Sequence, residues 1–156
     1  MDETTRALIE RHGLAPHPEG GHYRRVHASA CEVEVHGRRR PAMTAIRYLL
    51  APGEASAWHR VDGDEAWRWQ HGGALELRLF DAGAGRFSRT RLGPAPLGGG
   101  VSCLVPAGVW QSAHADDEAV LLMCTVAPGF VWEGFELLDP GSALAAELAR
   151  REAVHD

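Results

Sequence analysis

The stretch that decides the fold is APGEASAWHRVDGDEAWRWQHGG, residues 51–73. A proline–glycine pair opens it and a glycine pair closes it, so a turn is predicted at each end. Between the turns lie His59 and Glu65, separated by a short acidic turn. If residues 56–60 and 65–71 are adjacent antiparallel strands, His59 and Glu65 come close together. A histidine beside a carboxylate can bind a metal ion or transfer a proton, so this stretch is a candidate site.

The composition is that of a soluble globular protein. Of the 156 residues, 45% are hydrophobic and 24% are charged, which is ordinary for a folded domain. The length favours one domain, residues 1–156, with a sizeable core. The formal net charge of −5 disfavours nucleic acid or an anionic membrane as a partner. All 16 basic residues are arginine, which excludes Schiff-base chemistry on a lysine of this chain.

The cysteines indicate the compartment. There are three, without a CxxC pair, and no secretory signal pattern precedes the domain, so a reducing, cytoplasmic setting is expected. Cys103 and Cys124 lie in apolar runs and are interpreted as buried, inert thiols.

Short strands at even spacing are predicted along most of the chain, with one helix near each end. Alternation is clearest in ALELRLFD, residues 74–81, where every second residue is a leucine. Glycine- and proline-rich turns separate about nine or ten such segments, a pattern typical of an all-β sandwich or small barrel. The predicted strands are 22–29, 43–50, 56–60, 65–71, 74–81, 86–92, 101–105, 109–114, 119–126 and 131–137, and the predicted helices are 2–13 and 142–151.

Two charged groups outside these strands have simple interpretations. The three consecutive arginines 38–40 are predicted to lie in a solvated hairpin tip or loop, with a clamp for an acidic ligand as the alternative. Asp62 and Asp64 are interpreted as solvated turn residues.

Two segments match the two motifs of the cupin superfamily by spacing. The first, residues 53–72, places His59 and Glu65 at motif positions, and the second, residues 100–111, ends on Gln111. More specifically, the chain resembles the single-domain cupins sometimes called cupin type five. Five segments carry this resemblance: HPEGG at 17–21, TAIRYLL at 44–50, HRVDGDEAW at 59–67, VPAGVWQSA at 105–113 and CTVAPGF at 124–130.

The resemblance extends over residues 8–138 and has consequences for fold and assembly. It implies a double-stranded β-helix, the cupin jelly roll, with short N- and C-terminal helices and a site in the mouth of the barrel. It also implies a homodimer. It assigns no reaction.

The ligand positions of the general cupin pattern are only partly kept. That pattern supplies three histidines and one glutamate, a set suited to a divalent transition metal. Here Val61 and Gln111 stand at two of the histidine positions. His59 and Glu65 then remain, with Gln111 as a weak oxygen ligand, and two good ligands rarely hold a transition metal tightly. A weakly bound divalent metal at His59, Glu65 and Gln111 is therefore kept as an alternative to a metal-free site.

His59 and Glu65 are predicted to form a catalytic acid–base pair in a concave barrel mouth. Strand parity and the HPEGG loop add candidates for substrate binding: Gln111, Glu19, Tyr23, Thr44, Tyr48, Trp67 and Trp69. Among them, Gln111 is expected to point its amide at the ligand. Trp67 or Trp69 is expected to wall the pocket as a stacking surface.

Three functions are open from the sequence, each with a small-molecule ligand. The first is an isomerase- or epimerase-type enzyme that acts on a small polar, sugar-like substrate through His59 and Glu65, by analogy at the level of the fold. The second is a divalent-metal-dependent enzyme. The third is a non-catalytic small-ligand binding module.

Overall fold

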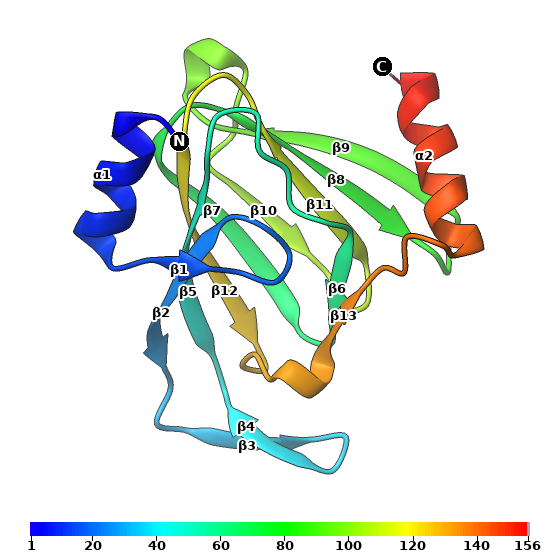
Figure 1. Ribbon diagram of the computed structural model, residues 1–156. Helices are drawn as coiled ribbons and strands as arrows, with labels where there is room; N and C mark the ends of the chain where they lie inside the picture. Colours follow the sequence, from blue (N-terminus) through cyan, green and yellow to red (C-terminus); the bar gives the residue numbers. More distant parts are fainter. Residues whose placement is uncertain (156) are drawn as a thin grey trace.

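Two antiparallel β-sheets face each other in the structure, a computed structural model that describes residues 1–155 (Figure 1). The larger sheet has the order β1-β2-β5-β12-β7-β10 and the smaller one β13-β6-β11-β8-β9. This is the jelly-roll arrangement expected from the sequence. The larger sheet consists of β1 (Ala15–Pro16), β2 (His22–Ala28), β5 (Thr44–Leu50), β12 (Val120–Ala127), β7 (Asp64–Gly72) and β10 (Ser102–Val105). The smaller sheet consists of β13 (Phe135–Leu137), β6 (His59–Val61), β11 (Trp110–Ala115), β8 (Leu75–Asp81) and β9 (Arg86–Leu92).

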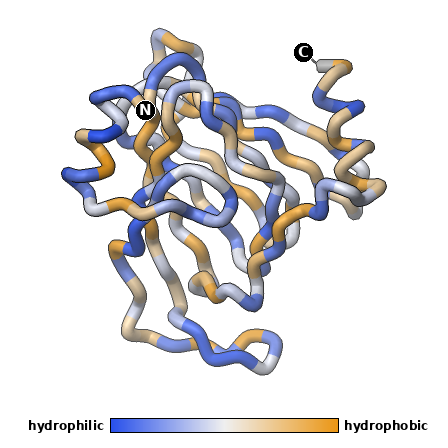
Figure 2. Tube along the Cα trace, viewed as in Figure 1, coloured by the Kyte–Doolittle hydropathy of each residue, from blue (hydrophilic) through white to orange (hydrophobic). Residues whose placement is uncertain are grey.

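The core lies between the two sheets and follows from the alternation in the sequence. In β8, Leu75 and Leu77 are fully buried, whereas Glu76 and Arg78 point to the outer face. Strand β12 runs between β5 and β7, and apolar residues occupy both of its faces. Figure 2 shows how short apolar and polar stretches follow one another along the strands. Of the two cysteines expected in the core, Cys124 is buried and Cys103 only partly so.

The two predicted helices lie at the ends of the chain. Helix α1 (Glu3–His12) begins after Asp2, whose carboxylate accepts a hydrogen bond from the Thr5 amide at 2.9 Å, and it ends at Gly13, which has a φ of 61°. Helix α2 (Ala143–His155) begins after Ser142, whose hydroxyl accepts from the Ala145 amide at 3.1 Å. Both caps satisfy amides that a helix terminus leaves free.

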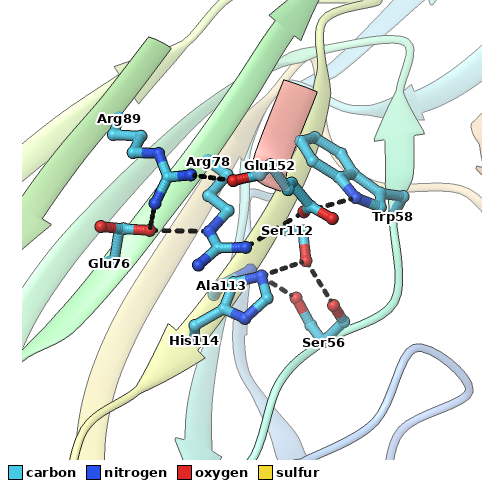
Figure 3. Close-up of polar contacts among 9 residues, drawn as sticks. All are labelled: Ser56, Trp58, Glu76, Arg78, Arg89, Ser112, Ala113, His114 and Glu152. Carbon is cyan, nitrogen blue, oxygen red and sulfur yellow. Dashed lines mark hydrogen bonds and ion pairs between the residues drawn. The ribbon is translucent and has the colours of Figure 1, made fainter. Parts of the chain in front are cut away.

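Polar contacts fix α2 to the outer face of the smaller sheet (Figure 3). Glu152 accepts a hydrogen bond from Trp58 Nε1 at 3.1 Å and lies 3.3 Å from Arg78 NH1. Arg89 on β9 donates to the Glu152 carbonyl at 3.1 Å. None of the helices formed by residues 1–155 is long and apolar enough to cross a membrane.

The arginine run lies in a hairpin, one of the two settings predicted for it, and Arg38 and Arg39 are exposed, but the expected solvation is wrong for Arg40. Strands β3 (Glu32–Val35) and β4 (Arg38–Pro41) pair with each other and form a two-stranded sheet of their own. Arg40 is 2% exposed and donates to both carboxylate oxygens of Asp62, at 2.9 and 2.8 Å, and to the Gly129 carbonyl at 2.7 Å. A buried guanidinium needs such acceptors. Asp62 is therefore an ion-pair partner and not a freely solvated turn residue.

Two strand predictions also need correction. Residues 56–60 and 65–71 are not neighbours, because β6 pairs with β11 and β13 while β7 pairs with β10 and β12. His59 and Glu65 therefore come from facing sheets. Of the predicted strand 131–137, only residues 135–137 form a strand, β13, and the 3₁₀ turn η2 (Trp132–Gly134) precedes it. A second such turn, η1 (Ala95–Leu97), lies before β10.

Candidate functional site

A cavity of about 320 Å³ lies between the two sheets, and its lining includes Trp132 and Glu133 of η2 and Phe135 of β13. Figure 1 shows the position of β13 at one end of the barrel. The size of the cavity suits a small molecule. Exposure gives its depth: His59 and Glu65 are 2% and 7% exposed and lie inside, whereas Trp132 is 47% exposed and lies at the mouth. Arg25 is a further lining residue. Titratable groups thus sit in a buried interior below a more exposed, partly aromatic mouth.

Both ring nitrogens of His59 face oxygen acceptors. Nε2 lies 2.9 Å from Glu19 Oε2, and Nδ1 lies 2.8 Å from the Ala57 carbonyl. A carbonyl and an ionised carboxylate only accept, so both nitrogens carry protons and His59 is an imidazolium. Burial alone would lower the pKa of His59, but the charge and hydrogen bond of Glu19 outweigh it and raise the pKa to about 9. Burial works against ionisation of Glu19 too, yet the charge of His59 lowers its pKa.

The loop that carries Glu19 is held tightly against the barrel. Gly20 and Gly21 have φ values of 103° and 72°, and a Cβ on Gly21 would lie 2.7 Å from the Leu49 carbonyl. Only glycine follows this path without strain. Below the loop, Tyr48 is fully buried and its hydroxyl donates to the Gly20 carbonyl at 2.6 Å. Tyr48 therefore supports the loop and does not line the cavity, which corrects its expected role in binding.

Glu65 is oriented by two side chains from within the core. Gln111 Nε2 donates to Glu65 Oε1 at 2.7 Å, and Trp67 Nε1 donates to Gln111 Oε1 at 2.7 Å. Because an indole N–H can only donate, it fixes which end of the Gln111 amide faces Glu65. The second carboxylate oxygen, Oε2, has no hydrogen bond to any of residues 1–155. Burial raises the pKa of Glu65 to about 7; the charge of His59 opposes this and that of Glu19 adds to it.

His17 is a cavity residue that was not among the predicted site residues. Its Nδ1 accepts a hydrogen bond from the Glu19 amide at 3.1 Å, and burial lowers its pKa. A neutral ring whose Nδ1 accepts must carry its proton on Nε2. His17, which lines the cavity, therefore carries its N–H donor on Nε2. The HPEGG motif that drew attention to Glu19 contains this histidine, so the signal was present in the sequence.

An aromatic wall completes the mouth and was also missed. The ring of Trp132 lies 4.9 Å from that of Phe130 and 5.5 Å from that of Phe135. The backbone of Phe130 is fixed on both sides: its amide donates to Thr44 Oγ1 at 2.9 Å, and its carbonyl accepts from Arg25 at 3.1 Å. The sequence signal was the aromatic content of residues 130–135, which could not show the direction of the rings.

The structure brings together one part of the predicted site. Predicted residues that line the cavity are His59, Glu65, Glu19, Tyr23 and Thr44.

Three other candidates are corrected. Gln111 is fully buried and uses its amide on Trp67 and Glu65, so it does not point at a ligand. Trp67 is 1% exposed, and Trp69 lies four residues beyond Glu65, about 13 Å along the strand, where its indole donates to the Gly73 carbonyl. Neither tryptophan lines this cavity, so the predicted stacking surface is wrong.

The donor set does not fit a tightly bound transition metal. Within residues 1–155, no group of three or more His, Cys, Asp or Glu side chains is placed to hold a metal ion. In the expected ligand set, both nitrogens of His59 are engaged and the Gln111 oxygen faces Trp67. Val61, at a former histidine position, lines the cavity with an apolar side chain. The expected set of His59, Glu65 and Gln111 is therefore not assembled for coordination.

Comparisons with known proteins agree with this fold. A model of the family described as "Cupin superfamily (DUF985)" matches residues 6–138. A hypothetical protein from Leishmania major is similar at 30% identity with a TM-score of 0.81, over 94% of this chain and 92% of that one. A protein from Shewanella oneidensis is similar at 32% identity with a TM-score of 0.81, over 95% of this chain and 92% of that one.

More distant likeness concerns the fold alone. Oxalate decarboxylase from Bacillus subtilis shares 19% identity with a TM-score of 0.59, over 86% of this chain and 34% of that one. No functionally curated protein matches the chain.

Proposed function

This chain belongs to the cupin superfamily, in the family described as DUF985, and we propose that it is a proton-transfer enzyme of the isomerase or epimerase type acting on a small polar, sugar-like molecule. One observation carries the proposal. Glu65 is a buried carboxylate in the cavity, with one oxygen held by Gln111 and the other without a hydrogen bond to residues 1–155. Such a group is oriented for proton transfer and still available to a substrate.

Glu65 is the group that exchanges the proton. Its pKa of about 7 means that both protonation states are populated near neutral pH. A general acid–base catalyst works best when its pKa lies near the operating pH. The hydrogen bonds from Trp67 to Gln111 and from Gln111 to Glu65 keep the carboxylate in one orientation.

His59 supplies a fixed positive charge. Its two N–H groups are directed at Ala57 and Glu19, so it has no free nitrogen with which to accept a proton. Glu19 balances this charge at 2.9 Å, so the pair adds no net charge to the cavity and the acid–base role falls to Glu65. Within the predicted acid–base pair, Glu65 thus titrates, and His59 is oriented by Glu19.

Glu65 and His17 together suit one class of reaction. Moving a proton on a carbon beside a carbonyl requires a base and a donor for the oxygen that becomes negative. Glu65 is the base, and the Nε2–H of His17 is the donor. Tyr23 and Thr44 line the same cavity, and we assign their hydroxyls to the polar groups of the substrate. No step requires a metal, for which the donor set is unsuited.

Hydrogen–deuterium exchange tests the proposal. Small aldoses, ketoses and oxo acids are incubated with the protein in D₂O, and the loss of the C–H signal beside the carbonyl is followed by ¹H NMR. We expect exchange in at least one compound and a loss of about 10²-fold or more in Glu65→Gln, which keeps the shape but cannot take the proton.

Asp64→Asn is the matched control. Asp64 is the exposed neighbour of Glu65 and accepts from the Ala107 amide at 2.9 Å, and its variant should exchange like the wild type. Equal exchange in Glu65→Gln and the wild type would contradict the role of Glu65. Binding of these aldoses, ketoses or oxo acids without exchange in any of them would instead favour a non-catalytic binding module.

A further inference from the structure

We propose that the mouth of this cavity recognises a ligand in which a flat ring is joined to an anionic group, a carboxylate or phosphate, with the ring against Trp132 and the anion at Arg25. The inference rests on the proposed function only in that the other end of the same ligand reaches Glu65. It concerns the mouth, where the exposed lining residues lie.

Trp132 provides the surface for the ring. It is 47% exposed, although three rings hold it in place, those of Phe130, Phe135 and His17 at 4.9, 5.5 and 5.7 Å. A large aromatic side chain that is held rigid yet left half uncovered loses little conformational entropy when it binds a flat group. An indole with this exposure at a cavity mouth therefore favours a ring-bearing ligand.

Arg25 provides the contact for the anion. Its one hydrogen bond within residues 1–155 goes to the Phe130 carbonyl, at 3.1 Å. Arg40 and Arg60 near the same end of the barrel pair with Asp62 and Glu136, whereas no ion pair joins Arg25 to an acid in this part of the chain. Its remaining N–H groups form the planar fork that binds carboxylate or phosphate.

The charges inside the cavity place the anion at the mouth. His59 and Glu19 offset each other as an ion pair at 2.9 Å. Glu65 adds a negative charge when it is ionised, so a second anion in the interior would be repelled. Glu133 also lines the cavity, and its carboxylate disfavours an anion bound next to it. Arg25 is therefore the position at which a negative group is stabilised.

Matched small probes test the assignment. Phenylacetate carries both features, phenylacetamide lacks the charge, and acetate lacks the ring. Affinities are measured at pH 7.5 by ligand-observed NMR for the wild type, Arg25→Gln, Trp132→Leu and Arg24→Gln. Arg24 is the exposed neighbour of Arg25 on β2 and is absent from the cavity lining. Thermal unfolding of each variant confirms that it is folded.

We expect phenylacetate to bind the wild type about tenfold more tightly than phenylacetamide, the size of effect that one charge-assisted hydrogen bond gives. Arg25→Gln removes this preference and Arg24→Gln keeps it. Trp132→Leu weakens phenylacetate to the level of acetate and phenylacetamide below that level. Replacing phenylacetate by phenyl phosphate then shows which of the two anions binds more tightly.

Equal binding of phenylacetate and phenylacetamide would overturn the proposal. So would equal losses in Arg24→Gln and Arg25→Gln, or no binding of phenylacetate at millimolar concentration. These titrations need no turnover, and Glu65→Gln should still bind phenylacetate. The proposed ligand class can therefore be refuted while proton transfer by Glu65 is still supported. Proton transfer can likewise be refuted while the ligand class is still supported.

Discussion

Replacing Glu19 by glutamine should change how the stability of this protein depends on pH. The pKa of His59 is raised from 6.5 to about 9 in the folded state, chiefly because Glu19 outweighs the effect of burial. Each pKa unit corresponds to about 1.4 kcal/mol, so the raised pKa contributes on the order of 3 kcal/mol to the free energy of unfolding. A histidine with a raised pKa gives this contribution fully below pH 6.5 and loses it as the pH rises through 9.

Urea unfolding followed by circular dichroism at pH 6.5, 7.5, 8.5 and 9.5 measures the effect. Glu19→Gln should be less stable than the wild type by about 3 kcal/mol at pH 6.5, and the gap should narrow markedly by pH 9.5. The quantity to compare at each pH is the difference in the free energy of unfolding between the wild type and Glu19→Gln. Burial raises the pKa values of Cys103 and Cys124, so these thiols change the stability of both proteins over the same pH range.

Glu136→Gln is the matched control for the loss of one carboxylate. Glu136 pairs with Arg60, and the two side chains are 55% and 40% exposed, so its removal should cost less than about 1 kcal/mol. The cost should also be the same at each pH. Parallel pH profiles for the wild type and Glu19→Gln would refute the assignment of Glu19 as the partner that keeps His59 charged.

The remaining predictions concern Glu65, the hairpin anchor and metal. Burial raises the pKa of Glu65 from 4.5 to about 7, so protonation of Glu65 stabilises the fold fully below pH 4.5. This contribution to the free energy of unfolding is lost as the pH rises through 7. In urea unfolding, Glu65→Gln should lack this fall in stability between pH 4.5 and 7. Arg40→Met should cost about 3–5 kcal/mol by removing the partner of Asp62, whereas Arg39→Met, whose partner Glu32 is 53% exposed, should cost under about 1 kcal/mol. Metal analysis of protein purified without chelators and then dialysed should find less than one metal ion per chain; a stoichiometric ion would contradict the conclusion that the donor set does not hold a transition metal tightly. Sedimentation should find twice the mass of one chain if the homodimer implied by the family resemblance forms, and the mass of one chain otherwise.

Local sequence pattern was sufficient for most of the fold. Alternation fixed the inward face of β8, and the proline and glycine pairs marked the ends of β5 and β7, because such signals act within a few residues. The cupin resemblance implied a site in the barrel mouth, and His59 and Glu65 both line one cavity there, which they reach from facing sheets. Local pattern failed at β3 and β4, where charged residues form a hairpin whose one buried arginine is satisfied by a distant aspartate.

The partners inside the site could not be predicted because they are distant along the chain. Glu19 meets His59 across 40 residues, and Gln111 meets Glu65 across 46. Sequence spacing therefore suggested Glu65 as the partner of His59 in place of Glu19, because spacing detects only residues that are close along the chain. The alternation of side chains along the strand correctly placed Trp67 and Trp69 on the inward face. Alternation does not show how far along the barrel a residue lies, so their distance from the cavity mouth was missed.

The central claim is that Glu65 exchanges a proton near neutral pH. Its most direct test is a ¹³C NMR titration of the glutamate δ-carbons, with the signal of Glu65 assigned by its absence in Glu65→Gln. We predict a midpoint near pH 7 for this signal. A midpoint near 4.5, the value of an ordinary glutamate, would mean that Glu65 stays ionised at neutral pH and would contradict its role as the acid–base group.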